Sequence, residues 1–369
     1  MCKRENLRTN LCKRAKLCYD KYDIRKETEK TEDRMHKICI LYTGGTIGMT
    51  RTEDGYAPVA DYLATALTRI EDLYRDSMPH WDLIEMNPLL DSANMAVEDW
   101  NRIARTIGEN YHAYDGFVIL HGTDTMAYTA SALSFMLENL DKPVVLTGSQ
   151  IPLCELRSDG RDNLITSLLI AAQGKVREVC LYFGGRLLRG NRATKYSADG
   201  MLAFRSPNAP YLAEAGIEVR YSEPLLRKPE GGAFRVQTFS QVPIGVIKVF
   251  PGIQFDIFES IMTERLKGIV VETFGAGNIP GNGKALLPII TKAVVNGTVL
   301  TVCSQCPEGT VTLGAYAASA ALKDAGAVSG YDMTTEAAVA KLYYLFSCGY
   351  DTATIKQKME TDLRGELTR

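Results

Sequence analysis

Short apolar runs recur along the chain from residue 36 onward, and each is followed by a cluster of glycine and polar residues. The runs are three to seven residues long and cover 38–42, 117–120, 144–146, 179–183, 244–250, 269–271 and 298–302. Continuous runs of Val, Ile, Leu and aromatic residues are typical of parallel strands that are buried on both faces. The pattern therefore predicts seven buried strands.

Amphipathic stretches with a helical period separate several of these runs. The residues that share one face are Met126, Ala130, Leu133 and Leu137 in 125–137, and Val339, Leu342, Tyr343 and Phe346 in 336–346. Such spacing predicts helices that pack one side against a core. Because strands alternate with helices, the chain is predicted to be an α/β protein with a mostly parallel sheet flanked by helices.

A cluster of proline, glycine and charged residues interrupts this alternation near 205–242. We interpret 206–242 as a linker between a larger N-terminal domain, 36–205, and a smaller C-terminal α/β domain, 243–369. Residues 1–37 hold 12 Lys/Arg against 7 Asp/Glu and contain no serine. A basic amphipathic transit peptide is the alternative there, but transit peptides are rich in serine. A charged, disordered extension over 1–35 is the preferred prediction.

The overall composition excludes several classes of protein. The chain is 46% hydrophobic and 23% charged, with a net charge of −2, so no global field favours nucleic acid or an anionic membrane. Its apolar runs fall short of the roughly 18 residues that span a bilayer. Nine cysteines with no disulfide-type spacing, and no secretory signal, indicate a cytoplasmic protein with free thiols. Neither a metal nor a cofactor is expected, because no complete ligand motif occurs.

Three of the predicted strands run directly into hydroxyl residues and glycines, at 43–48, 121–125 and 147–150. The carboxyl ends of parallel strands form the ligand crevice of an open sheet. Nucleophiles and bare backbone N–H groups are therefore expected to gather there. The first stretch lacks the Lys-Ser/Thr of a phosphate loop, and one polar residue in the second is needed as a helix cap. Capping does not account for three polar residues in a row.

Taken together, Thr-Gly-Gly-Thr-Ile-Gly at 43–48 and His-Gly-Thr-Asp-Thr at 121–125 resemble the two signature blocks of bacterial-type L-asparaginases. The resemblance continues, in order, through 91–95, 147–150, 192–195 and 274–278. It covers about residues 36–350 and looks closest to the cytoplasmic type I branch. It implies amide hydrolysis through a threonine acyl-enzyme.

The resemblance also implies a role for individual residues. Thr46 and Thr123 align with the two reactive threonines, and the order in which they attack stays open. Tyr56 aligns with the tyrosine of a mobile lid, and Asp124 and Lys195 align with the residues that accompany the second threonine. A desolvated lysine beside a threonine can accept its proton, since burial favours the neutral amine.

A second group of positions is implied to bind L-asparagine. The substrate-binding residues are Asp91, Ser92, Thr123, Asp124, Ser149 and, from a neighbouring subunit, Asn278. The carboxylates would pair with the α-ammonium of the substrate, and Ser92 would donate to its α-carboxylate. The family expectation is a homo-oligomer built as a dimer of dimers.

The predicted function is therefore hydrolysis of L-asparagine to L-aspartate and ammonia. The alternatives are a broader glutaminase-asparaginase, the amidase subunit of a tRNA-dependent amidotransferase, and a non-catalytic amino-acid sensor on the same scaffold. Some type I enzymes carry a second, allosteric asparagine site that uses an arginine where this chain has Glu272. A carboxylate there would repel the α-carboxylate of such an effector.

Overall fold

The computed structural model describes residues 36–369 apart from 54, 230, 260–264 and 281–285. The extension predicted for 1–35 lies outside these residues. Residues His36–Arg369 form one unit, whose described residues contain an eight-stranded sheet, a four-stranded sheet and three two-stranded sheets. None of the helices in the described ranges is long and apolar enough to cross a lipid bilayer.

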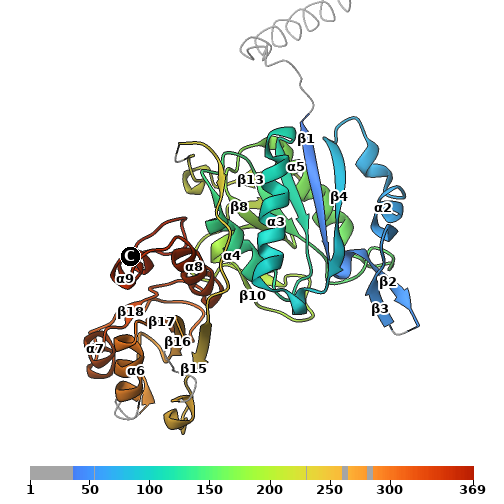
Figure 1. Ribbon diagram of the computed structural model, residues 1–369. Helices are drawn as coiled ribbons and strands as arrows, with labels where there is room; N and C mark the ends of the chain where they lie inside the picture. The colour runs from blue at the N-terminus through green and yellow to red at the C-terminus, as the bar shows by residue number, and fades with distance from the viewer. Residues whose placement is uncertain (1–35, 54, 230, 260–264, 281–285) are drawn as a thin grey trace, which may run out of the picture. The chain divides into compact units, whose positions relative to one another are not determined.

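The larger sheet has eight strands in the order β13-β12-β9-β8-β7-β5-β1-β4 (Figure 1). Its strands are β1 Lys37–Gly44, β4 His80–Leu90, β5 Gly116–Leu120, β7 Val144–Thr147, β8 Val179–Phe183, β9 Arg186–Arg189, β12 Ala213–Ala215 and β13 Val219–Tyr221. The strands from β4 to β8 pair in parallel, and β9, β12 and β13 continue the sheet in antiparallel pairs. The prediction of a mostly parallel sheet is confirmed.

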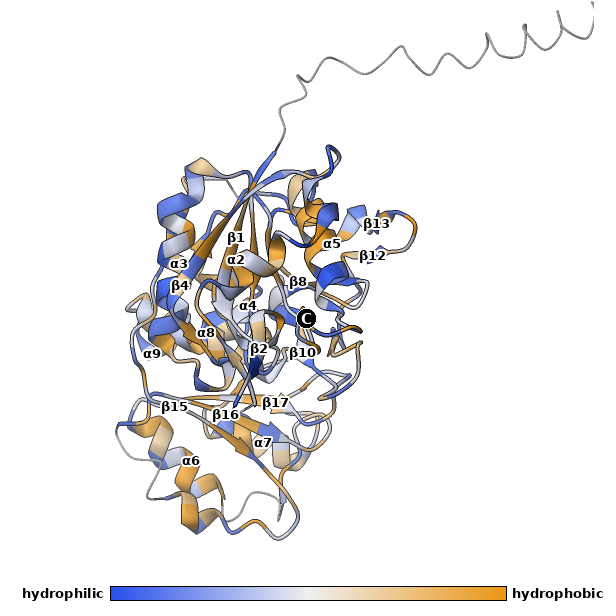
Figure 2. Cartoon of the chain, turned by 90° about the vertical axis from the view of Figure 1, so that its right-hand side faces the viewer, coloured by the Kyte–Doolittle hydropathy of each residue, from blue (hydrophilic) through white to orange (hydrophobic). Residues whose placement is uncertain are grey.

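Helices cover both faces of this sheet, and the side chains of β1 show why its sequence is apolar throughout. Cys39 and Leu41 belong to a buried cluster with α3 Val97–Asn110 and α4 Met126–Met136. Their neighbours Ile38 and Ile40 point the other way, into a cluster with α2 Tyr62–Leu67 and α5 Gly160–Gln173. Figure 2 shows the hydrophobic colour of β1 between these helices. Successive strand residues face opposite sides, so both must be apolar here.

The smaller sheet is parallel throughout, in the order β15-β16-β17-β18. Its elements are β15 Ile244–Lys248, β16 Gly268–Thr273, β17 Val299–Ser304, β18 Val328–Ser329, α6 Leu286–Val295, α7 Ala317–Asp324, α8 Thr335–Ser347 and α9 Thr352–Met359. In β16, Ile269 and Val271 pack with α6 and α7, whereas Val270 joins the cluster that contains α8. The predicted smaller α/β part of the chain is confirmed.

Helix α8 also packs against α4, so the two sheets share a buried cluster. At this junction the Tyr344 hydroxyl donates to Glu138 Oε1 at 2.6 Å. Glu138 belongs to β6 Leu137–Glu138, which pairs with β14 Arg235–Val236. A hydroxyl that is buried needs such a partner to offset the loss of water. Helix α4, which begins directly after the motif at 121–125, therefore packs against helix α8 of the smaller sheet.

All seven predicted strands and both predicted helices are present, with their ends shifted by a few residues. The stretch 206–242, interpreted as a linker, contains β12, β13 and β14, and the first two extend the larger sheet. The division of the chain at that stretch stays a prediction. Shorter elements complete the fold: β2 Met49–Thr52, β3 Gly55–Pro58, β10 Thr194–Lys195 and β11 Phe204–Arg205.

Candidate active site

Glycines bring the carboxyl ends of four neighbouring strands into direct backbone contact. A Cβ on Gly45, after β1, would overlap the backbone of Gly122, which follows β5. A Cβ on Gly122 would in turn overlap the side chain of Ser92, which follows β4. Gly148, after β7, lies equally close to the carbonyl oxygen of His121. Only residues without a side chain allow these loops to approach so closely.

Thr123, Asp124 and Lys195 form one hydrogen-bonded group at this edge. Lys195 Nζ donates to Thr123 Oγ1 at 3.0 Å and lies 2.6 Å from Asp124 Oδ1. Thr123 is 7% exposed, whereas the Asp124 side chain is 62% exposed. The ammonium group is therefore shared between a buried hydroxyl and a carboxylate that reaches solvent. This arrangement can move a proton to or from the threonine oxygen.

Lys195 comes from the short strand β10, which pairs with β11 rather than with the larger sheet. Its neighbour Thr194 donates to Glu336 Oε1 at 2.7 Å, on the first turn of α8. Burial raises the pKa of Glu336 above that of an ordinary glutamate, and its like-charged neighbour Glu272 adds to this shift. Helix α8 thus contacts β10, the strand that carries Lys195.

Gln150 is a residue of this site that the sequence interpretation did not assign to catalysis. Thr123 Oγ1 donates to Gln150 Oε1 at 3.3 Å. The Gln150 amide group donates to the carbonyl oxygens of Ala198 and Gly200 at 3.2 Å each. Its backbone N–H donates to the carboxylate of Asp159. Gln150 therefore orients the Thr123 hydroxyl, and its place in the 147–150 motif was the signal that could have identified it.

Thr46 lies in the 3₁₀ turn Thr46–Gly48 that follows β1, with Gly45 as the residue before the turn at φ 88°. Thr46 and Tyr56 line the same groove of about 600 Å³, which Gln150 also lines. In the described residues no hydrogen bond joins the two hydroxyls. The site thus has two threonines on adjacent loops. Thr46 lines this groove, and Thr123 accepts a hydrogen bond from Lys195.

Tyr56 is held on the hairpin of β2 and β3 by charged neighbours. Its hydroxyl donates to Glu155 Oε1 at 2.5 Å and accepts from Arg51 Nε at 3.1 Å. Arg51 and Glu155 also form an ion pair at 3.4 Å. The three side chains fasten the hairpin over the groove. Glu155 lies 99 residues from Tyr56 in the chain, and no spacing rule identifies such a pair from the sequence.

The predicted substrate-binding residues differ in exposure. Asp91 is exposed and accepts from the N–H of Ala93 at 3.1 Å, which caps a short turn. Ser92 is 4% exposed and touches Gly122, and its carbonyl oxygen accepts from Thr125 Oγ1 at 2.8 Å. Ser149 is 1% exposed, and its hydroxyl has no hydrogen-bond partner among the described residues. Asp91 and Ser92 therefore lie at the edge where the glycines meet.

Asn278 lies elsewhere, in a tight turn after β16, where it exchanges backbone hydrogen bonds of 2.9 Å with Phe274. No hydrogen bond within the described chain joins it to the threonines. Glu272 precedes that turn and lines a second cleft of about 810 Å³, which Lys195 also lines. Its carboxylate accepts from Thr335 Oγ1 at 2.6 Å.

His121 is completely buried beneath the site. Desolvation lowers its pKa to about 4, so the imidazole is neutral at pH 7. One ring nitrogen lies 2.7 Å from the carbonyl oxygen of Gly122, and the other lies 2.9 Å from Thr129 Oγ1. Trp100 Nε1 donates to that same hydroxyl at 3.1 Å. This chain of hydrogen bonds fixes the peptide that precedes Thr123.

Among the described residues, no three His, Cys, Asp or Glu side chains gather as metal ligands.

Comparisons with known proteins agree with this geometry. The family model described as "Asparaginase, N-terminal" matches residues 37–227, and the "Glutaminase/Asparaginase C-terminal domain" matches 243–359. The chain is 49% identical to L-asparaginase 1 of Escherichia coli K12 over 331 residues, which cover 90% of this chain and 98% of that one. It is 36% identical to the L-asparaginase of Thermococcus kodakarensis over 340 residues, which cover 90% and 99% of the two chains.

A solved structure is similar over nearly the same length. The crystal structure of L-asparaginase I from Vibrio cholerae superposes with a TM-score of 0.84 at 47% identity, covering 90% of this chain and 99% of that one. Both the sequence motifs and the arrangement of the two sheets are therefore shared with type I L-asparaginases. The protein belongs to the asparaginase family.

Proposed function

We propose that this protein is an L-asparaginase, which hydrolyses the side-chain amide of L-asparagine to give L-aspartate and ammonia. Its relatives of that name and the matching family models support the proposal. The observation that carries it is the hydrogen bond of 3.0 Å between Lys195 Nζ and Thr123 Oγ1, beside Asp124. A lysine beside a threonine hydroxyl is the pairing of base and nucleophile that amide hydrolysis needs.

The reaction proceeds in two steps through an ester of a threonine. A threonine oxygen attacks the amide carbonyl carbon and its proton passes to a base, a role that we assign to Lys195 because its Nζ contacts Thr123 Oγ1. The carbon–nitrogen bond breaks and the nitrogen leaves as ammonia, taking up a proton. Water then attacks the ester, which releases aspartate and restores the threonine hydroxyl. Thr46 and Thr123 both remain candidates for the first attack.

The carbonyl oxygen gains negative charge in both steps and needs hydrogen-bond donors. The glycine contacts leave bare backbone around Gly45 and Gly122, directly beside the two threonines. We assign the N–H groups of these loops to the oxyanion. The neutral His121 holds the peptide between Gly122 and Thr123, and a fixed peptide keeps such a donor aimed.

Recognition of the amino acid is assigned to the charged groups around the threonines. Asp124 and Asp91 would pair with the α-ammonium, and Ser92 would donate to the α-carboxylate. The exposure of Asp124 and the position of Ser92 against Gly122 support this assignment. Ser149 offers a buried hydroxyl without a partner in the described chain, which a bound substrate can satisfy.

Release of ammonia from L-asparagine by the purified protein tests the function. The intact chain is compared with Thr46→Ala and Thr123→Ala, with L-glutamine as the second substrate. Loss of turnover in both variants supports the mechanism, whereas full activity in both would overturn it. Binding of asparagine without turnover by the intact chain would instead identify the sensor. A similar rate with glutamine would identify the glutaminase-asparaginase.

We further propose that the enzyme is a cytoplasmic homo-oligomer, arranged as a dimer of dimers, with Asn278 completing a neighbour's site. No hydrogen bond of the described chain joins Asn278 to either threonine, which is compatible with a role in a neighbour's site. The six cysteines of the described residues are free, as a reducing compartment requires. Sedimentation of the purified protein tests the assembly, and Asn278→Ala tests the contribution of that residue to kcat.

A further inference from the structure

The last residues of the chain, 361–369, follow α9 and form neither helix nor strand. We refer to them as the C-terminal segment. Glu366 in this segment is completely buried and Leu367 is 5% exposed. A segment without regular structure must find other partners for its backbone groups when it is buried. Those partners include helix α8, the stretch 189–192 that leads into β10, Asp332, and the carboxylate of Glu366 itself.

On the α8 side, an ion pair holds the segment. Lys341 Nζ lies 2.5 Å from Glu366 Oε1, and both side chains are inaccessible to solvent. The same ammonium group donates to the carbonyl oxygens of Met359 and Thr361, at 3.0 and 2.6 Å. Because a buried charge without its partner is strongly destabilising, this pair fixes the segment in one conformation.

On the other side, the segment contacts residues that precede Lys195. Asn191 Nδ2 donates to the carbonyl oxygen of Arg364 at 3.0 Å. The Arg192 guanidinium, 5% exposed, donates to the Glu366 carbonyl oxygen at 2.9 Å and to Thr368 Oγ1 at 2.6 Å. Arg192 therefore binds the segment at one backbone carbonyl and at one side-chain hydroxyl.

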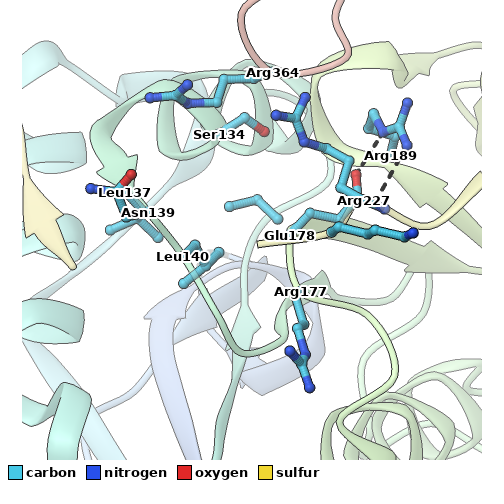
Figure 3. Close-up of a pocket in the computed structure, with 11 residues that line it drawn as sticks. Ser134, Leu137, Asn139, Leu140, Arg177, Glu178, Arg189, Arg227 and Arg364 are labelled. Carbon is cyan, nitrogen blue, oxygen red and sulfur yellow. Dashed lines mark hydrogen bonds and ion pairs between the residues drawn. The ribbon is translucent and has the colours of Figure 1, made fainter. Parts of the chain in front are cut away.

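Two carboxylates hold the arginines of the stretch 189–192. Asp332 Oδ1 accepts from Arg192 at 2.9 Å and from the N–H of Thr368 at 2.7 Å, so one carboxylate joins the arginine to the segment. Glu178 accepts from Arg189 Nε at 2.6 Å. Figure 3 shows the pair formed by Arg189 and Glu178 beside a cavity of about 40 Å³, with Arg364 of the C-terminal segment on its margin.

The distance along the chain from this attachment to the catalytic lysine is short. Arg192 ends the 3₁₀ turn Gly190–Arg192, Ala193 follows, and Thr194–Lys195 form β10. The Thr194 hydroxyl is fixed on Glu336 at 2.7 Å. Only Ala193 and Thr194 therefore separate the arginine from the lysine, so a shift of the backbone at Arg192 is passed on over two residues.

We infer that the C-terminal segment positions Lys195, and that Arg192 is the positioning residue through which it acts. Arg192 touches neither threonine, but its bonds to Thr368 and Asp332 set where β10 begins and so how far Lys195 Nζ reaches. The inference rests on the proposed function, because it assigns Lys195 to catalysis. A displacement of about 1 Å at a reacting group can lower the rate about a hundredfold.

Two variants and a matched control test the inference in the full-length protein. Arg192→Lys removes the two-pronged contact, and Thr368→Val removes one acceptor while keeping the shape of the side chain. Thr361→Val is the control, because the Thr361 hydroxyl donates to the Gln357 carbonyl oxygen at 2.9 Å and contacts nothing in 189–195. For each we would measure kcat, KM and Tm, and the ¹⁵N resonance of Lys195 Nζ during a pH titration. That resonance is assigned by its loss in Lys195→Met.

We expect Thr368→Val to lower kcat about tenfold with KM and Tm unchanged, and to move the Lys195 titration. Thr361→Val should change neither. An unchanged kcat and an unchanged titration in Thr368→Val would overturn the inference, even if Arg192→Lys fails to fold. If the wild type releases no ammonia, the proposed function fails. In that case the pH titration of the Lys195 Nζ resonance still tests the positioning role. A changed titration in Thr368→Val supports the role, and an unchanged one rejects it.

Discussion

Lys195 donates a hydrogen bond of 3.0 Å to the hydroxyl of Thr123, which lies 72 positions earlier in the chain. Thr123 lies in the loop that follows β5 of the larger sheet, and Lys195 belongs to a two-residue strand outside that sheet. The contact joins a nucleophile candidate to a base candidate, and it depends on how both loops are held.

Replacing Lys195 by methionine should lower kcat by a factor of about 10² to 10⁴, the usual contribution of a general base. The aliphatic stem is retained, so folding should change little. Ammonia release under saturating asparagine measures the effect. Lys175→Met is the control, since Lys175 is exposed and its contacts are with Glu223 and the ring of Tyr221, neither of which belongs to the site. Equal losses in both variants would contradict a specific role for Lys195.

Glu155→Gln should weaken closure of the hairpin that carries Tyr56. The amide keeps the size of the side chain but loses the ion pair with Arg51 and accepts less strongly from the tyrosine hydroxyl. We expect kcat to fall about tenfold, roughly the effect of one charge-assisted hydrogen bond. Steady-state kinetics provide the measurement. Glu53→Gln, on the same hairpin but exposed, should retain wild-type kcat.

Stability should fall as the pH drops below 6.5, because of His121. Its pKa is about 4 in the folded protein, so between pH 6.5 and 4 the unfolded chain binds a proton that the folded chain does not. The free energy of unfolding should decrease by about 2 kcal/mol between pH 7.5 and 5 from this group. Urea unfolding at both pH values measures the change. In His121→Gln this component should vanish, and an undiminished pH dependence would rule out His121 as its source.

The rate should depend hyperbolically on the concentration of L-asparagine. Glu272 places a carboxylate in the second cleft, held there by Thr335, and a carboxylate repels the α-carboxylate of an amino-acid effector. Initial velocities over a wide range of asparagine concentrations provide the check. A sigmoidal curve would show that an effector site exists despite Glu272.

Gly45→Ala should be far more damaging than a glycine substitution elsewhere. At Gly45, with φ 88°, an added Cβ would overlap the backbone of Gly122, which cannot move without displacing Thr123. We expect a loss of stability above about 3 kcal/mol, or loss of activity. Gly174→Ala is the matched control, with φ 62° and nothing within 4 Å. It should cost only about 1 kcal/mol. Thermal unfolding and ammonia release compare the two.

The sequence pattern predicted the buried strands well because each is apolar on both faces. Strand β1 is the example: residues of both parities lie in cores, so the run has no polar interruption. Strand β4 was missed because it forms the edge of the sheet and is only half-buried, and its mixture of Asp82, Glu85 and Asn87 with apolar residues has no clear period. A strand that is buried on both faces can therefore be recognised in a single sequence, because its apolar run is unbroken.

The site was predictable where short motifs carry it, as for Thr46 and Thr123. Contacts between distant loops were not. The pairing of Tyr56 with Glu155, and the attachment of Arg192 to Thr368, join residues 99 and 176 positions apart. No local rule links such positions, because the path between them runs through the whole arrangement of strands. Gln150 lies between these cases: its motif was noted, but only the structure gives its bond to Thr123.

The close approach of Gly45, Gly122 and Ser92 has a consequence for attempts to change the substrate. Gly45 and Gly122 meet through main chain, so these two positions offer no side chain that a mutation could trim to make room. Laboratory evolution toward bulkier amides would therefore find little variation there. Adaptable positions lie instead on the hairpin and on the rim around Gln150, where side chains line the groove.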